Sequence, residues 1–428
     1  MAEEESEMVG GDGTAGIVWS ELPKDVRLKV LSHLGIQDLC RMRCVCREWR
    51  DVIHHRDFRG MYDMANSSQE PRPVMCYLES SYPLRLEWTA YDYEGKLWKK
   101  MNSFPSLSHS CLTTLNARVQ NFSSLNVGLY SVGGLLCLLR WHYLQVIETG
   151  RAPSPCRVIS SWTVWNPYRN RWKKLLPPCK HKVSDIASSF VHVFVSDERT
   201  KAYKILMAHG VASHPNHSFH AGEQKLVTEI YDSRTGTWTD GAEHTLKAKL
   251  SYRRPFVRGV LCNGVIYFAT ERYETHQINR FSRPSVLLSY DINKDEWLEE
   301  TLDSFLLLFE WDGRLMALNV DNAADGSTEQ KFLEWDLVRR MWKDTCMSMP
   351  LKIGKAFRYD LEGFSIVASG NHLAVTGLTM DVTEFRIAVY KRAENYWRMP
   401  PTATFSDKLR PARVEGLVLH RPSLDWRP

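Results

Sequence analysis

No run of apolar residues in this 428-residue chain approaches the roughly 20 positions that a membrane-spanning helix needs. The longest apolar runs, such as GGLLCLL at 133–139, have the length of a buried strand instead. Residues 1–16 are acidic and rich in glycine and match neither a signal peptide nor a transit peptide, so we expect a disordered tail there. These absences predict no membrane partner and a cytoplasmic or nuclear location, in which the ten cysteines stay reduced.

Recognisable catalytic motifs are also lacking. The chain has no phosphate-binding loop, no Gly-x-Ser-x-Gly nucleophile elbow and no His-Glu-x-x-His pair. The formal net charge of +5 is too small for a dedicated nucleic-acid binder, which carries a dense basic patch. We therefore expect a protein that is not an enzyme, with no catalytic residues, no cofactor and no direct contact with nucleic acid.

Three groups of residues were considered as metal ligands. The segment HGVASHPNHSFHAG (209–222) holds four histidines, which bind zinc only if three or four converge at about 2 Å; a solvated insertion between strands is the favoured interpretation. Cys40, Cys44 and Cys46 lack Cys-x-x-Cys spacing, which favours core thiols. The segment NVDNAADGSTE (319–329) has apolar residues at two positions where a calcium loop needs oxygen ligands, which favours a surface turn. No bound metal is expected.

The strongest positive signal lies within residues 22–58, where apolar residues recur at helical spacing. One stripe repeats every four residues from Leu22, and further leucines lie on another side of the same helix. Pro23 suits a first helical turn, Gly35 ends that helix, and a second stripe follows at Val45, Trp49 and Ile53. This pattern predicts three short helices, and a unit so small rarely buries enough core to be stable alone.

These residues resemble an F-box. The F-box pattern begins with Leu-Pro, continues with spaced leucines and ends in Val-Cys-[Lys/Arg]-x-Trp, and only Gly35 departs from it, where many F-boxes carry proline. The resemblance implies binding to the Skp adaptor of a cullin-type ubiquitin ligase, whereas a bundle packed only against its own chain is the alternative. The residues that match the family's adaptor-binding positions are Leu22, Pro23, Val26, Val30, Leu34, Leu39, Val45, Cys46 and Trp49.

Beyond the F-box the composition changes. Residues 61–74 are polar with two prolines, which predicts a linker of limited flexibility. From there to the end, runs rich in Val, Ile, Phe, Tyr and Trp alternate with turn residues every eight to twelve positions. We therefore predict a mainly β protein with a small α domain, arranged as a tail (1–16), an F-box (17–60), a linker (61–74) and an all-β domain (75–428).

The all-β domain contains a loose repeat with two parts. In one part, an aromatic strand, a polar turn and a tryptophan follow one another, as in IYDSRTGTWTD, and the six tryptophans are Trp98, Trp172, Trp238, Trp297, Trp342 and Trp397. In the other part, a pair such as Gly-Gly, Asn-Gly or Asp-Gly joins two apolar runs, as in LCNGVIYFA. Both parts have the residues of a β-hairpin, and two hairpins in succession make a four-stranded antiparallel sheet.

The spacing of these tryptophans, 45 to 74 residues, is close to the roughly 50-residue period of kelch-type propeller blades. We therefore predict a kelch-like β-propeller of six blades, with seven blades and an unrepeated sandwich as alternatives. The first repeat is short, so we expect the C-terminal run RVEGLVLH (413–420) to supply its missing strand and close the ring.

Two further strings narrow the resemblance. WNPYRNRWKKLLPP (165–178) and FVSDERTKAYKILMA (194–208) resemble elements of plant F-box proteins with kelch or F-box-associated C-terminal domains. Together with the F-box, this resemblance implies a non-catalytic substrate receptor of a Skp–cullin–F-box ubiquitin ligase, whose partners are the Skp adaptor, the cullin and an unknown target protein. The alternatives are a transcriptional co-regulator acting through a DNA-binding partner, and a propeller enzyme.

A candidate surface for the target protein lies in the segment LSYRRPFVRG (250–259). It combines arginine with aromatic residues, a composition typical of interface anchors and anion recognition. A solvated basic connection is the competing interpretation. The residues that we expect to bind the target are Tyr252, Arg253, Arg254 and Arg258.

Overall fold

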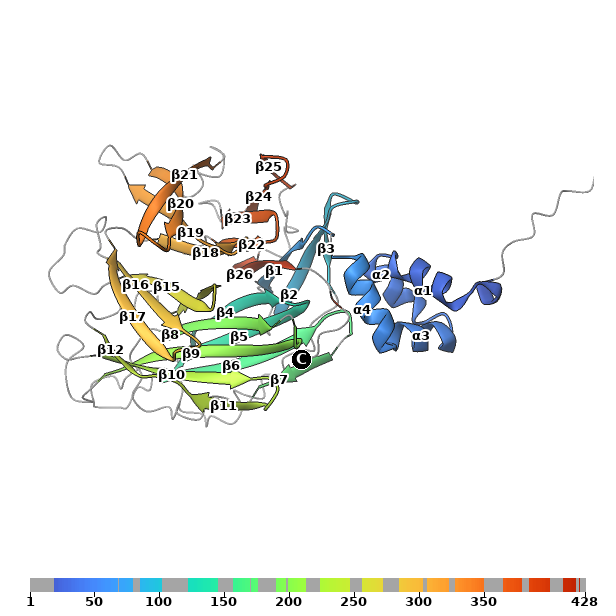
Figure 1. The fold of residues 1–428 in the computed structure, drawn as a ribbon, viewed down its shortest axis with the longest axis horizontal. Coiled ribbons are helices and arrows are strands. Elements are labelled where there is room, and N and C mark those ends of the chain that lie inside the picture. The colour runs from blue at the N-terminus through green and yellow to red at the C-terminus, as the bar shows by residue number, and fades with distance from the viewer. Residues whose placement is uncertain are drawn as a thin grey trace, which may run out of the picture. The chain divides into compact units, whose positions relative to one another are not determined.

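The structure is a computed structural model (Figure 1) that describes residues 19–67, 69–79, 85–101, 122–144, 157–169, 171–175, 190–197, 199–212, 224–246, 256–271, 285–302, 306–322, 328–349, 365–378, 385–400, 411–420 and 423. The chain divides into two compact units. We call them the helical unit, Met1–Gln69, and the propeller unit, Glu70–Pro428.

The helical unit holds four described helices, where the apolar pattern predicts three. After a single 3-10 turn (Trp19–Glu21) come α1 (Lys24–Ser32), α2 (Ile36–Met42), α3 (Arg47–His54) and α4 (Arg56–Ala65). The extra break is at His55, which has extended backbone (ψ 143°) and ends α3 while it caps α4. No proline or glycine marks this break, so the spacing of apolar residues alone could not locate it.

Two boundaries differ from the sequence-based expectation. Gly35 is the N-cap of α2, because α1 already ends at Ser32. Helix α4 continues to Ala65 and strand β1 begins at Arg72, so helix and strand take up both ends of the predicted linker. The side-chain amide of Asn66 holds the end of α4 in place, since it donates to the carbonyl oxygens of Tyr62 and Ser32, each at 2.8 Å.

The core of the helical unit is small and well buried. Its fully buried apolar side chains come from all four helices, and they are Leu31, Ile36, Leu39, Ile53, Phe58 and Tyr62. Contacts join α1 to α4, α3 to α4 and α2 to α3, so the four helices form one bundle.

In the propeller unit the described strands form six sheets, which we call blades 1 to 6. Blade 1 has the order β26-β1-β2-β3, with β26 (Pro411–His420), β1 (Arg72–Glu79), β2 (Arg85–Asp92) and β3 (Leu97–Lys100). Blade 2 consists of β4 (Phe122–Val132), β5 (Leu135–Leu144), β6 (Arg157–Asn166) and β7 (Arg171–Lys174).

Blade 3 carries two additional strands. Its four main strands are β8 (Phe190–Asp197), β9 (Ala202–Ala212), β10 (Gln224–Asp232) and β11 (Thr237–Asp240). A short strand β12 (His244–Leu246) pairs with β10, and β13 (Phe256–Arg258) runs parallel to β8.

Blades 4 to 6 are four-stranded. Blade 4 consists of β14 (Val260–Cys262), β15 (Val265–Glu271), β16 (Ser285–Asp291) and β17 (Glu296–Leu302). Blade 5 consists of β18 (Leu306–Trp311), β19 (Arg314–Asn322), β20 (Thr328–Asp336) and β21 (Met341–Ser348). Blade 6 consists of β22 (Ser365–Ser369), β23 (His372–Leu378), β24 (Phe385–Lys391) and β25 (Tyr396–Arg398).

The blades close into a ring, which confirms the predicted six-bladed propeller. The innermost strands touch one another in the order β26, β4, β8, β14, β18 and β22, and β22 touches β26 again. The ring is completed by the C-terminal strand, as the sequence predicts, since β26 pairs antiparallel with β1 from Arg72↔His420 to Glu79↔Pro411 (Figure 1). A buried hydrophobic cluster fills each of the six seams between neighbouring blades.

The six tryptophans of the repeat occupy one equivalent position. Each lies on the outer strand of its blade and pairs in register with an aromatic residue of the third strand, as in Tyr91↔Trp98 and Trp335↔Trp342. The ring centroids of these two pairs are 5.4 and 4.9 Å apart. The pattern of aromatic residue, turn and tryptophan therefore identifies the hairpin of the third and fourth strands in each of the six blades.

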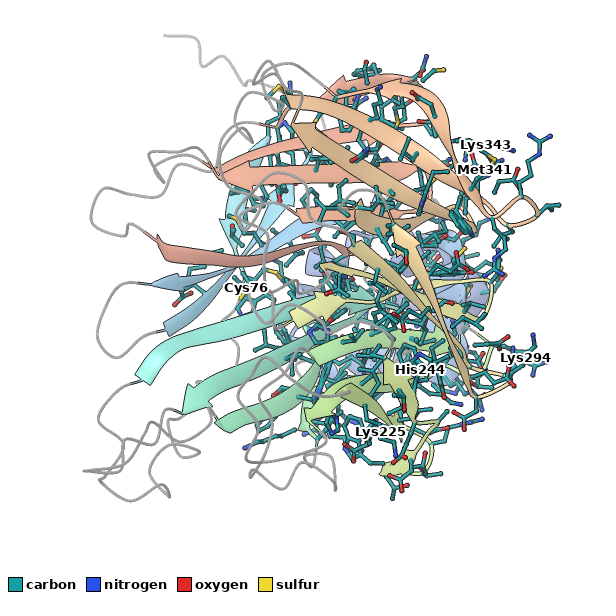
Figure 2. All side chains as sticks on the ribbon, turned by 90° about the vertical axis from the view of Figure 1, so that its left-hand side faces the viewer. Cys76, Lys225, His244, Lys294, Met341 and Lys343 are labelled. Atoms are coloured by element: carbon teal, nitrogen blue, oxygen red, sulfur yellow. The ribbon has the colours of Figure 1, made fainter. Side chains whose placement is uncertain are left out.

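The turn of this hairpin is held by its own side chain. In five blades an Asp or Asn ends the third strand and accepts backbone N–H groups of the turn, as when Asp291 accepts from Asn293 at 2.9 Å. Blade 6 has Lys391 at this position instead. Because strands in each sheet alternate in direction, the first and third turns of every blade lie at the same end of the ring, which we call the turn end. Figure 2 shows Lys294 and Met341, from the outer hairpins of blades 4 and 5, along that end.

Candidate functional site

Most of the predicted adaptor-binding residues lie at the surface of the helical unit. Val26, Val30 and Val45 are 38%, 45% and 64% exposed, although all three are apolar. Val26 and Val30 lie one turn apart on α1 and therefore share a face of that helix. Pro23 and Cys46 are also exposed, whereas Leu22, Leu34 and Trp49 are half-buried.

Leu39 does not belong to this surface. It is 1% exposed and lies on α2, among the residues that form the core of the bundle. Its position in the F-box pattern therefore reflects the packing of the bundle beneath the exposed residues, because a leucine that recurs at helical spacing can serve the core as well as a partner.

A residue that the pattern did not include supports Trp49. The ring of Trp19, which precedes the first helix, lies 4.9 Å from the ring of Trp49 on α3. The contact between the Trp19 and Trp49 rings therefore packs the start of the bundle against α3. In the sequence, the only indication of this contact is that a tryptophan stands a few positions before Leu22-Pro23.

The cysteines of the helical unit differ from the expectation of core thiols. Cys44 and Cys46 are exposed and Cys40 is half-buried. Burial raises the pKa of the Cys40 thiol. Cys46 caps α3, because its sulfur accepts the backbone N–H of Trp49 at 3.4 Å. The reason for the difference is position, since Cys44 and Cys46 lie between the ends of α2 and α3 and not on an inward-facing helix side.

Of the predicted target-binding residues, the structure describes one. Tyr252, Arg253 and Arg254 lie outside the described residues. Arg258 ends the short strand β13, and its guanidinium lies over the ring of Tyr130 at 5.1 Å. Tyr130 belongs to β4 of blade 2 and β13 to the sheet of blade 3, so the contact between Arg258 and Tyr130 joins these two neighbouring blades.

Arg258 as a residue is exposed to solvent, while its guanidinium group is surrounded by protein. This crowding lowers the pKa of Arg258 to about 10. No carboxylate pairs with it among the residues that the structure describes. Beneath it, the Tyr130 hydroxyl bonds to Nδ1 of His192, whose pKa is lowered to about 3 by burial and by the charge of Arg258. Sequence patterns could not reveal Tyr130 and His192, because these residues meet Arg258 only when blades 2 and 3 pack together.

Arg258 lies away from the turn end. Strand β13 pairs with the first three residues of β8, from Phe190 to His192, whereas β8 reaches its turn with β9 at Asp197. Arg258 therefore lies at the end of the ring opposite the turn end.

The chain enters the propeller unit at the turn end. Glu70, the first residue of this unit, accepts a hydrogen bond from Lys391 at 2.6 Å at the end of β24. Burial alone would raise the pKa of Glu70, but the nearby Lys391 ammonium outweighs this effect, and the pKa is lowered. The Tyr93 hydroxyl donates to the Pro71 carbonyl oxygen at 3.3 Å and holds the next residue in place. The point at which the chain enters is thus fixed to blades 1 and 6.

Further sequence candidates are partly described. His209 is buried within β9, and the other three histidines of its segment lie outside the described residues. Residues 319–322 belong to strand β19 and residues 328–329 to β20, while 323–327 are not described. Across the described parts of the chain, no three metal-ligating side chains converge, and no helix is both long enough and apolar enough to span a membrane.

Comparison with protein families identifies both units. A model of the F-box domain matches residues 19–59, and a model of the F-box associated β-propeller domain matches residues 156–307. The first match covers helices α1 to α3 and ends within α4. The second begins in blade 2 and ends where blade 5 begins.

Similar proteins include F-box proteins of Arabidopsis thaliana. An F-box/kelch-repeat protein is 25% identical over 58% of this chain and 51% of its own length. A putative F-box protein is 42% identical over 51% of this chain and 46% of its own length. The chain thus spans about half the length of each of these two relatives. Among solved structures, a microbial sialidase aligns with a TM-score of 0.43 at 11% identity, over 64% of this chain and 57% of its own.

The helical bundle, the six-bladed ring and the family matches agree with one another and with the resemblance seen in the sequence. The chain therefore combines an F-box domain with an F-box associated β-propeller domain, and its homologues are F-box proteins of plants, among them an F-box/kelch-repeat protein.

Proposed function

We propose that this protein is the substrate-recognition subunit of a Skp–cullin–F-box ubiquitin ligase. The helical unit binds the Skp adaptor and, through it, the cullin, while the propeller unit binds the protein to be ubiquitinated. The chain contributes no catalytic residue in this proposal. It raises the local concentration of the target beside the subunits that transfer ubiquitin.

The observation that carries the proposal is apolar surface on a bundle whose core is already filled. Val26 and Val30 share one face of α1 and remain 38% and 45% exposed, while Leu31 of the same helix is 1% exposed. A helix that is apolar on a second side gains free energy when another polypeptide covers that side. The F-box match makes a Skp-type adaptor the expected partner.

Substitution of Val30 tests the adaptor interface. In Val30→Glu, a carboxylate replaces an exposed apolar side chain, so the bundle should stay folded while the Kd for a purified Skp adaptor rises at least about tenfold, the effect of losing a contact of roughly 1.4 kcal/mol. Isothermal titration calorimetry measures the Kd. Val338→Glu is the matched control, because Val338 is 92% exposed in blade 5 and should not affect adaptor binding. Equal Kd values for the two variants would contradict the proposal.

Affinity purification from plant cells under proteasome inhibition tests the division of labour between the units. The intact chain should recover adaptor and cullin, and a variant lacking residues 17–60 should lose both but retain the target. If instead the deleted variant bound DNA, or a DNA-bound partner, in a salt-sensitive manner, the transcriptional co-regulator would be the better assignment.

We also propose that Arg258 contacts the target, since it is an exposed residue at the end of the ring opposite the turn end and has no carboxylate partner among the described residues. Arg258→Glu should then reduce recovery of the target and leave recovery of the adaptor unchanged. Arg339→Glu makes the same charge reversal in the outer hairpin of blade 5, at the turn end, and should change neither. Unchanged target recovery with Arg258→Glu would remove this residue from the interface.

A further inference from the structure

The helical unit contains an open hollow that is lined by three cysteine and three arginine residues. It lies between the end of α2 and the first turn of α3, and its volume of about 620 Å³ is within the range of small-molecule sites. The residues that line it are Cys40, Arg43, Cys44, Cys46, Arg47 and Arg50. No acidic residue is among them. Asp51 lies next to the hollow, with its carboxylate 3.9 Å from Nε of Arg50, so the three arginines leave a net positive charge that attracts anions.

Cys46 is the thiol best placed to react in this hollow. It is exposed, and as the N-cap of α3 it lies where the backbone N–H groups of that helix point outwards. Its sulfur accepts one of them, from Trp49, at 3.4 Å. Exposed cysteines beside a helix N-terminus and arginine side chains are the ones that take part in thiol exchange.

The two neighbouring thiols are less suited to this role. Cys40 is half-buried, and burial raises the pKa of its thiol, which disfavours the thiolate that attacks a disulfide. Cys44 is exposed, but its S–H points to the carbonyl oxygen of Cys40 at 3.9 Å. The geometry therefore distinguishes Cys46 from both.

We propose that this hollow binds a small disulfide that carries carboxylates, such as oxidised glutathione, and that Cys46 exchanges with it to form a mixed disulfide. The Cys46 thiol releases its proton to water, and the sulfur attacks one sulfur of the bound disulfide. A new S–S bond forms while the original S–S bond breaks, and the departing thiolate takes up a proton. The small disulfide is the only oxidant required, and a thiol reductant reverses the step.

A consequence follows that rests on the function proposed above. Cys46 adjoins Val45, and both belong to the predicted adaptor surface. A mixed disulfide would fill the hollow and add negative charge at that surface, so it would weaken adaptor binding until it is reduced. Assembly of the ligase would then respond to the ratio of oxidised to reduced small thiols.

The test uses the intact chain and needs no adaptor. Reduced protein is incubated with oxidised glutathione, and the fraction modified at each cysteine is followed by peptide mass spectrometry. Cys346 is the internal control, because it is exposed on β21, away from any helix N-terminus, and the carboxylate of Asp344 accepts its backbone N–H at 2.8 Å. Cys46 should react about tenfold faster than Cys346 at low salt, and this ratio should fall as salt screens the arginines.

A disulfide reagent of opposite charge shows whether Cys46 reacts fast because the arginines attract the reagent or only because Cys46 is exposed. With cystamine, a cationic disulfide, the advantage of Cys46 should vanish. Arg47→Gln combined with Arg50→Gln should slow the reaction of Cys46 with oxidised glutathione and leave that of Cys346 unchanged. Cys44→Ser should keep the modification of Cys46, whereas Cys46→Ser should leave no fast-reacting site in the hollow.

Equal rates at Cys46 and Cys346 with oxidised glutathione, or the same preference with cystamine, would overturn the proposal. So would a fast reaction in the hollow that persists in Cys46→Ser. Because the readout is the mass of cysteine peptides, a protein that failed to bind any adaptor could still confirm this site, and the two proposals can fail separately.

Discussion

At the scale of single residues, the tryptophans that define the repeat are not its most buried side chains. Trp172 is 48% exposed, whereas its partner in register, Trp165, is 1% exposed. The third strand is covered by strands on both sides, but the outer strand has a neighbour on one side only. The tryptophan repeats in the sequence because it covers the aromatic residue of the third strand. How much of the tryptophan itself is buried depends on whether side chains of the neighbouring blade pack against it.

Replacement of two of these tryptophans should show this difference. Trp297→Ala should lower the free energy of unfolding by about 3–5 kcal/mol, because Trp297 is 7% exposed and its indole N–H donates to the Thr228 hydroxyl at 2.9 Å in the seam with blade 3. Trp172→Ala should cost much less, about 1 kcal/mol, as expected for a side chain in contact with water. Urea denaturation measures both. Equal losses would contradict the blade positions described for these residues.

Two buried histidines should make the ring sensitive to acid. Burial and a neighbouring arginine hold the pKa of His192 and of His420 at about 3, below the value of about 6.5 for an unfolded chain. Above pH 6.5 both states are neutral at these positions. As the pH falls from 6.5 towards 3, the unfolded state takes up protons that the folded state excludes, so stability falls.

At pH 5 each histidine should reduce the free energy of unfolding by roughly 2 kcal/mol. The measurement is the difference in unfolding free energy between pH 7.5 and pH 5. His420→Gln keeps a polar side chain beside the Ser131 hydroxyl and should make this difference smaller. A variant with the same pH dependence as the natural protein would show that His420 is protonated in the folded state.

At the scale of structural elements, hairpins were predictable and breaks between helices were not. The outer hairpin is marked by an aromatic residue, an Asp or Asn and a tryptophan at fixed offsets. These residue types recur because the hairpin turn requires a side chain that accepts its backbone N–H groups. The break at His55 carries no such marker, since it results from how α3 and α4 pack. The same is true of β13, which pairs parallel with β8 although strands β9 to β12 lie between the two in sequence.

The candidate sites divide in the same way. The exposed residues Val26, Val30 and Val45 were identified from the F-box pattern alone. Leu39 was misplaced, because the pattern does not separate residues of the core from residues of the surface. The environment of Arg258 was beyond prediction, since Tyr130 is 128 positions away along the chain.

Strand β26 should decide whether the ring closes. A chain that ends at residue 410 lacks the strand that pairs with β1 along its whole length and that contacts both β4 and β22. Blade 1 would lose its inner strand, and two seams would be open to water. We expect loss of a single cooperative unfolding transition, or unfolding at a much lower temperature, in a calorimetric scan. A truncated chain with the original melting temperature would contradict this role of β26.

At the scale of the whole molecule, the two compact units should be separable. Their boundary follows Gln69, and the contacts of Glu70 with Lys391 belong entirely to the propeller unit. A fragment that begins at Glu70 should therefore keep its melting temperature within a few degrees of the intact protein. Circular dichroism provides the measurement. A fragment that aggregates or melts early would show that the helical unit contributes to the stability of the ring.

The pairing of Arg72 with His420 has a practical consequence for engineering. These two residues are register partners on adjacent strands, so the beginning and the end of the propeller are about 5 Å apart. A short peptide can join them, and new termini can be opened at the Asp312–Gly313 turn, where an added Cβ meets no neighbouring atom. Such a circular permutant would keep the same ring with the F-box joined to it at a different blade, and would test whether the ligase function proposed above depends on the point of attachment.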